Sequence, residues 1–133
     1  MKKVIAIILL MSLFNSCANI KVNNAIKTVI GVWVVWKYEK DAVDQTIAWQ
    51  AIYSDYKLSF FKDGTETETY NNFGVTPVYT DGIYIFDDTV DHLTLSDENG
   101  TRAFSILTLR NDELDIELQH DTITEVYYLQ PLQ

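Results

Sequence analysis

The sequence predicts an all-β protein with one or two short helices, in which eight antiparallel strands close into an up-and-down β-barrel. From residue 56 onward, apolar and polar residues alternate with a period of two, which is typical of strands with one buried face. Asp63-Gly64 and Asn99-Gly100 lie between such runs, and both dipeptides are strong signals for tight hairpin turns. Strands joined in sequence by short turns form a meander, and closing the meander into a barrel removes its unpaired edges.

Length and charge limit the classes of protein that the chain can belong to. With 133 residues there is room for one domain, and a hydrophobic content of 47% argues against intrinsic disorder. The formal net charge is −9, and it becomes −11 once Lys2 and Lys3 are removed with a cleaved leader. Such a chain repels phosphate backbones, so nucleic acid is not an expected partner.

The first residues have the features of an export signal. Two lysines are followed by an apolar run over residues 4–14, which is shorter than the roughly twenty residues that a membrane-spanning helix needs. Asn15-Ser16-Cys17 then resembles the lipobox of bacterial lipoproteins, in which the cysteine is acylated and becomes the first mature residue. The resemblance implies a signal peptide over residues 1–16, a lipid anchor on Cys17 and a place in the bacterial cell envelope, at the outer membrane or facing the periplasm.

Alternatives to this interpretation are an ordinary cleaved signal with an incidental cysteine, or an uncleaved anchor. Cys17 is the only cysteine, so neither an intramolecular disulfide nor a thiolate metal cluster can form.

Residues 17–30 are expected to hold the anchor and a short helix, and residues 31–133 the barrel. The first strand is predicted over residues 32–39, and its first five residues are apolar on both faces. Residues 41–55 have apolar side chains at spacings of three and four, which favours a helix that covers the outer face of that strand. A strand over residues 46–53 remains an alternative.

The remaining strands follow from the alternation and the turn signals. The segment 65–70 consists of Thr and Glu before its final Tyr70, so we expect an exposed strand there. Leu114, Ile116 and Leu118 are predicted to point inward, with Asp115 between them pointing outward. The other predicted strands span residues 57–62, 78–86 with a bend at Gly82, 90–96, 101–109 and 122–129.

Several of these patterns together resemble the lipocalin-like domains of bacterial lipoproteins, which are calycin-type β-barrels. The residues that carry the resemblance are Gly31-Val32-Trp33, the hairpin over residues 60–65, the segment 81–85 and the final strands. It implies a structural role at the barrel floor for Gly31 and Trp33. Lipocalins commonly stack an arginine of the last strand on that tryptophan; here the last strand has none, which leaves Arg102 or Arg110 as possible substitutes.

The resemblance implies that the barrel binds a small apolar or amphipathic ligand. An eight-stranded barrel can hold one small ligand or be filled by its own side chains, and the sequence leaves both open. The inward positions that would line a cavity are Leu58, Phe60, Tyr84, Phe104, Leu114, Ile116 and Tyr128.

The alternative function is a protein-interaction or inhibitor module with a filled core, which would use the loop around Phe73 and Val75. No catalytic, cofactor-binding or metal-binding motif is recognisable, so we predict that the chain is not an enzyme. His92 and His120 lie on separate strands, and the aspartates at 87, 88 and 91 are expected to form a solvated turn.

Overall fold

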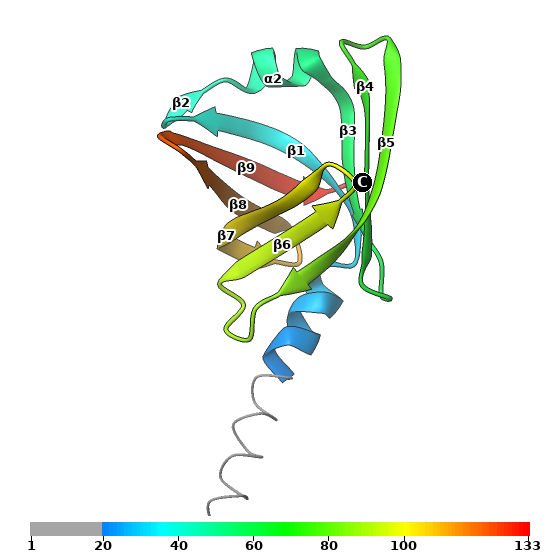
Figure 1. Ribbon diagram of the computed structural model, residues 1–133, viewed down its shortest axis with the longest axis vertical. Coiled ribbons are helices and arrows are strands. Elements are labelled where there is room, and N and C mark those ends of the chain that lie inside the picture. The colour runs from blue at the N-terminus through cyan, green and yellow to red at the C-terminus, as the bar shows by residue number, and fades with distance from the viewer. Residues whose placement is uncertain (1–19) are drawn as a thin grey trace, which may run out of the picture.

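The computed structural model describes residues 20–133, in which one short helix precedes a β-sheet and a second helix is inserted after the first strands (Figure 1). The elements are the helix over residues 20–29, β1 (Gly31–Lys40), β2 (Val43–Asp44), α2 (Thr46–Ile52), β3 (Tyr53–Phe60), β4 (Thr65–Asn72), β5 (Thr76–Phe86), β6 (His92–Asp97), β7 (Gly100–Arg110), β8 (Glu113–His120) and β9 (Ile123–Pro131). None of the helices in this part of the chain is long and apolar enough to cross a bilayer.

The sheet closes on itself as a barrel. Strands β3 to β9 pair antiparallel in chain order, β1 pairs with β3, and β1 also pairs with β9. The two-residue β2 adds only a short flap to the end of β1. The predicted closed, eight-stranded, antiparallel up-and-down barrel is therefore confirmed.

One end of the barrel is closed by the helix over residues 20–29, which lies below the strands in Figure 1. Val29 is fully buried, and the Nε1–H of Trp33 donates a hydrogen bond of 2.7 Å to its carbonyl oxygen. Gly31 links this helix to β1 with φ +132°, a backbone conformation that favours glycine. A short helix was expected within residues 17–30 and is present, whereas the predicted signal peptide and the lipid site at Cys17 lie outside the described residues.

The segment 41–55 is helical only in part, and it does not cover the outer face of β1. Its ends join strands, because Val43 and Asp44 pair with β1 and β3 begins at Tyr53. β1 and β3 pair only over three positions and then separate, and α2 lies at this end of the barrel (Figure 1). Trp49 of α2 points into the core, and the Gln50 side chain donates to the carbonyl oxygen of Val35, 3.2 Å away.

The expectation that the Thr/Glu strand is exposed is wrong. In β4, Glu66 is fully buried and Glu68 is 8% exposed. The cause is the hairpin register, which pairs Glu66 with Phe60 and Glu68 with Leu58. Directly paired residues share a face of the sheet, so both glutamates enter the barrel beside these core side chains.

The orientation of Tyr128 differs from the prediction, whereas Asp115 lies on the predicted outer face but is buried there. Tyr128 lies on the outer face, where its ring is 5.9 Å from that of Trp36, and Tyr127 of the same strand packs against the core instead. Trp36 is 47% exposed and lies at a β-bulge, so the outer face of β1 is not covered by a helix.

Asp115 is only 6% exposed, although the alternation predicts an exposed outer position for it. Its partners in register, Thr108 and Tyr128, flank it on the neighbouring strands.

Candidate functional site

The barrel contains a cavity of about 310 Å³, which is at the small end of the range for ligand sites in proteins. Its apolar wall comes from side chains that alternate inward on strands around the barrel. This wall consists of Val35, Leu58, Leu95, Phe104, Ile116 and Leu129.

An aromatic cluster lines the cavity where α2 meets β3. Trp49 stacks on Tyr53 with ring centroids 4.8 Å apart, and the ring of Tyr56 meets Trp49 edge-on at 5.2 Å. Tyr127 approaches the same indole from β9, at 5.9 Å. Flat, rigid rings of this kind offer apolar contact area together with hydroxyl groups that can orient a ligand.

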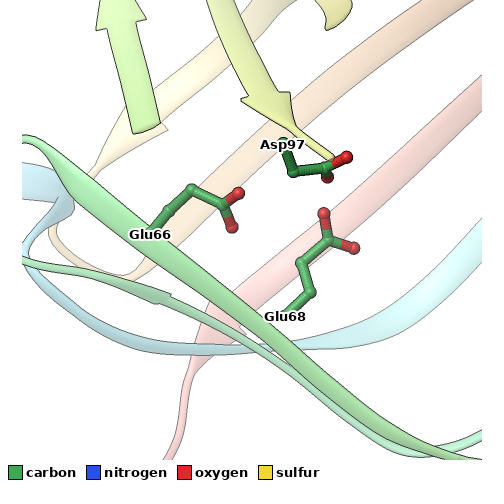
Figure 2. A group of neighbouring side chains, drawn as sticks. All are labelled: Glu66, Glu68 and Asp97. Atoms are coloured by element: carbon green, nitrogen blue, oxygen red, sulfur yellow. The ribbon is translucent and has the colours of Figure 1, made fainter. Parts of the chain in front are cut away.

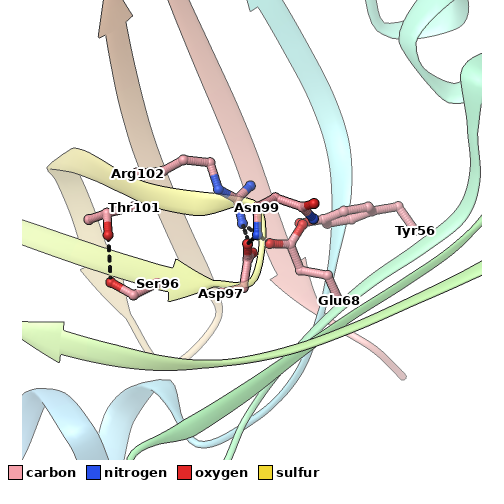
Figure 3. A network of polar contacts seen from close by, with 7 residues as sticks. All are labelled: Tyr56, Glu68, Ser96, Asp97, Asn99, Thr101 and Arg102. Atoms are coloured by element: carbon pink, nitrogen blue, oxygen red, sulfur yellow. Dashed lines mark hydrogen bonds and ion pairs between the residues drawn. The ribbon is translucent and has the colours of Figure 1, made fainter.

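The other part of the cavity wall is ionic. The Arg102 guanidinium pairs with Glu68 and lies 3.3 Å from Asp97 Oδ2, and the Tyr56 hydroxyl donates to Glu68 Oε2 at 2.8 Å (Figure 3). Burial lowers the pKa of Arg102, but the hydrogen bond to Glu68 and the charges of Glu68 and Asp97 together outweigh it, so the net shift is upward and the guanidinium stays charged. Burial, reinforced by the Glu68 charge, raises the pKa of Tyr56, which therefore remains a neutral donor.

A third carboxylate, Glu66, extends this ionic group. One carboxylate oxygen each of Glu66, Glu68 and Asp97 lies within 4.8 Å of the other two, and the three side chains converge in Figure 2. Neither oxygen of Glu66 has a hydrogen-bond partner. Burial is the main cause that raises the pKa of Glu66 to about 7, with the Glu68 charge second.

Gly82 provides the space for this group of carboxylates. In the sheet it pairs with Glu66 on one side and with Asp97 on the other. A Cβ at position 82 would collide with the backbone oxygen of Ser96 and would lie 2.5 Å from Glu66 Oε1. The sequence predicted a bend at Gly82. The structure shows that only a residue without a side chain at this position lets Glu66 and Asp97 approach each other.

The structure distributes the sequence-predicted residues over three places. Leu58, Phe104 and Ile116 line the cavity, whereas Phe60, Tyr84 and Leu114 are buried in the core but do not line it. Tyr128 is outside the barrel, as described above, and Tyr127 takes the expected inward place. Gly31 and Trp33 lie where the helix over residues 20–29 meets β1.

Neither arginine substitutes for the one that lipocalins stack on the floor tryptophan. The guanidinium of Arg102 lies 5.8 Å from the ring centroid of Phe104, and Arg110 pairs with Glu113 on the surface.

The polar members of the site were missed by sequence reasoning. Asp97 and Arg102 flank the Asn-Gly turn that joins β6 and β7, where charged residues are usually solvated. The two glutamates of β4 had a usable signal, because positions 66 and 68 share one face of a strand. Pairing that strand with 57–62 across the Asp63-Gly64 turn would have placed them opposite Phe60 and Leu58.

Comparison with solved structures agrees with the barrel fold. A lipocalin-like protein from Bacteroides uniformis superposes with a TM-score of 0.60 at 11% identity, over 79% of this chain and 99% of that one. An uncharacterized protein from Bacteroides eggerthii gives 0.55 at 14% identity, over 75% and 98%. Lobster apocrustacyanin A1 gives 0.59 at 13% identity, over 88% and 67%. No protein-family model and no curated protein matches the sequence.

The fold and the site together define a small β-barrel with a cavity that is apolar, aromatic and ionic in different parts of its wall. The chain has a lipocalin-like, calycin-type fold.

Proposed function

We propose that this protein is a lipid-anchored binding protein of the bacterial cell envelope that holds a small amphipathic molecule in its barrel. The observation that carries the proposal is the cavity, which combines an apolar wall and stacked aromatic rings with Glu68, Asp97 and Arg102. A lipocalin-like barrel supports binding rather than catalysis, and no group of the site is arranged as a nucleophile with its base.

The charge of the ionic wall restricts the polar group of the ligand. Two carboxylates and one guanidinium sum to −1, and the nearby Glu66 makes the wall more negative when it is ionised. An anionic head would meet like charge in a poorly hydrated site. The proposed ligand is therefore an apolar or aromatic body with a neutral or positively charged polar group.

Native mass spectrometry of the protein purified from the envelope fraction tests this proposal. We expect a reproducible adduct that is lost on mild delipidation. Ile116→Phe, which adds bulk to the cavity wall, is expected to reduce the bound fraction at least tenfold. Leu118→Phe is the matched control, because Leu118 lies two residues further along β8, packs against the core and is not part of the cavity wall.

A clean apo mass would argue against a ligand in the barrel if, in addition, fatty acids, long-chain amines and sterol-like probes leave the tryptophan fluorescence of the protein unchanged. The same conclusion follows if Ile116→Phe retains the adduct at the wild-type level, since the ligand would then be bound outside the cavity.

The envelope location rests on the sequence before the barrel, where a short apolar run precedes Cys17. Each buried methylene of an acyl chain contributes about 0.8 kcal/mol, so several chains on one cysteine anchor a protein stably. The wild-type protein is expected in the membrane fraction with an acylated Cys17, and Cys17→Ser in the soluble fraction. Intact-mass analysis that finds a free thiol on the mature wild-type chain would contradict the anchor.

Protein interaction is a second candidate function, favoured by the tip of the β4–β5 hairpin. Phe73 and Val75 are 67% and 80% exposed there, which is unusual for two large apolar side chains so close together. If the barrel proves empty, Phe73→Ser and Val75→Ser would be the first variants to compare with wild type in a crosslinking experiment on intact cells.

A further inference from the structure

We propose that Glu66, Glu68 and Asp97 form a binding site for one divalent cation of the calcium type inside the barrel. The proposal stands on observations different from those for the organic ligand argued above, but the two share Glu68 and Asp97, so a bound cation and a positively charged ligand group would compete for these carboxylates. A cluster of acidic residues alone would be weak grounds, because exposed carboxylates often gather without an ion. Here the decisive feature is the state of Glu66.

Glu66 is a fully buried carboxylate without a partner. Its exposed fraction is 0%, and neither Oε1 nor Oε2 accepts a hydrogen bond. Arg102 reaches Glu68 and Asp97, but no Lys, Arg or His side chain among residues 20–133 lies within ion-pair distance of Glu66. A buried polar group normally has its hydrogen bonds satisfied, and an ionised one needs a counter-charge. The unpaired side chain is directed at the other two carboxylates (Figure 2).

The spacing of the three carboxylates suits a cation. Three oxygens that are at most 4.8 Å apart have a common point within 4.8/√3, or about 2.8 Å, of each. Calcium–oxygen distances of roughly 2.3–2.6 Å need only a small contraction from there, whereas magnesium at about 2.0–2.1 Å needs a larger one. Carboxylate oxygens are the ligands that such hard cations prefer.

The charge of the group also indicates a divalent ion. With all groups ionised, three carboxylates and the Arg102 guanidinium sum to −2, and one divalent cation neutralises the group. Arg102 contacts Glu68 and Asp97 but not Glu66, which leaves Glu66 to provide the unshared negative charge. Further ligands are water molecules from the cavity, since Glu68 and Asp97 form part of its wall.

The sheet is built to bring these carboxylates together. Glu66, Gly82 and Asp97 occupy one row across β4, β5 and β6 in the registers given above. A side chain at position 82 would fill the space that Glu66 Oε1 occupies. The glycine at the centre of the row therefore lets two acidic side chains lie close together that a side chain at position 82 would separate.

Isothermal titration calorimetry on the full mature chain tests the site. The protein is purified with a chelator, dialysed at constant ionic strength and titrated with calcium chloride, magnesium chloride or butylammonium chloride. We expect one calcium ion per chain, weaker magnesium binding, and at least a tenfold loss of calcium affinity in Glu66→Gln, which keeps the shape of the side chain but removes its charge. Glu98→Gln is the matched control, because Glu98 is exposed and lies next to Asp97, and its replacement makes the same change in net charge.

Three results would overturn the proposal. The first is an absence of calcium binding in the wild type, and the second is equal calcium binding by wild type and Glu66→Gln. The third is a wild-type protein that binds butylammonium but binds neither calcium nor magnesium, which would assign the three carboxylates to an organic ammonium group instead. Circular dichroism of each variant shows that it is folded before its titration is interpreted.

Discussion

Replacement of Trp33 by alanine is expected to lower the free energy of unfolding by about 3–5 kcal/mol, the range for deleting a large buried aromatic side chain. Trp33 is 2% exposed, and its Nε1–H donates to the carbonyl oxygen of Val29. The substitution removes both the packing at the barrel floor and the hydrogen bond that fastens the helix over residues 20–29 to β1. Urea denaturation, followed by circular dichroism, measures the change.

Two further variants separate the contributions. Trp33→Phe keeps an aromatic ring but has no N–H donor, so it is expected to cost less than the alanine variant while leaving the Val29 carbonyl without its partner. Trp36→Ala is the matched control on the same strand, because Trp36 is 47% exposed, and it should cost about 1 kcal/mol or less. Equal losses for the alanine variants at 33 and 36 would show that Trp33 has no special role at the floor.

The second large effect is the dependence of stability on pH through Glu66, measured in the presence of a chelator. The pKa of Glu66 is raised to about 7, first by burial and then by Glu68, with Asp97 and Asp81 adding to the effect and Arg102 opposing it. The folded state therefore holds a proton that the unfolded chain releases near its ordinary pKa of about 4.5. As the pH rises from about 4.5 to about 7, this group alone should lower the free energy of unfolding by about 3 kcal/mol.

Glu66→Gln removes this part of the pH dependence. The stability of the variant relative to wild type is expected to increase by about 3 kcal/mol between pH 5 and pH 8, because glutamine has no proton to lose. Glu98→Gln should follow the wild-type curve, since Glu98 is exposed. Parallel curves for wild type and Glu66→Gln would mean that Glu66 does not titrate in this range. Adding calcium at pH 8 is expected to restore part of the wild-type stability if the proposed cation site is correct.

Much of the architecture was accessible from local sequence patterns. Period-two alternation locates the strands from β3 to β9, and Asp63-Gly64 and Asn99-Gly100 mark turns that the structure contains. A meander of this kind has few alternatives to closure, because an open eight-stranded sheet would leave two edges unpaired. The eight-stranded barrel could therefore be derived before any tertiary contact was known.

What alternation could not decide is which face of a strand is inside when both faces are similar. Tyr127 and Tyr128 are identical in chemistry, and only the buried Leu129 in the same frame shows that Tyr127 points inward. The strand containing Glu66 and Glu68 is polar on both faces, so its hydrophobicity carries no information about burial. Its orientation comes from pairing with Leu58 and Phe60.

The sequence by itself determined the class of fold, the turn positions and most of the apolar core, because these can be predicted from local patterns of apolar residues and turn dipeptides. Only the tertiary structure decided the composition of the site. It requires Trp49 from α2, Glu66 and Glu68 from β4, and Asp97 and Arg102 from either side of the β6–β7 turn. Their meeting inside the barrel depends on strand register and on the space left by Gly82, and the energy of each buried charge depends on neighbours that are distant in the sequence.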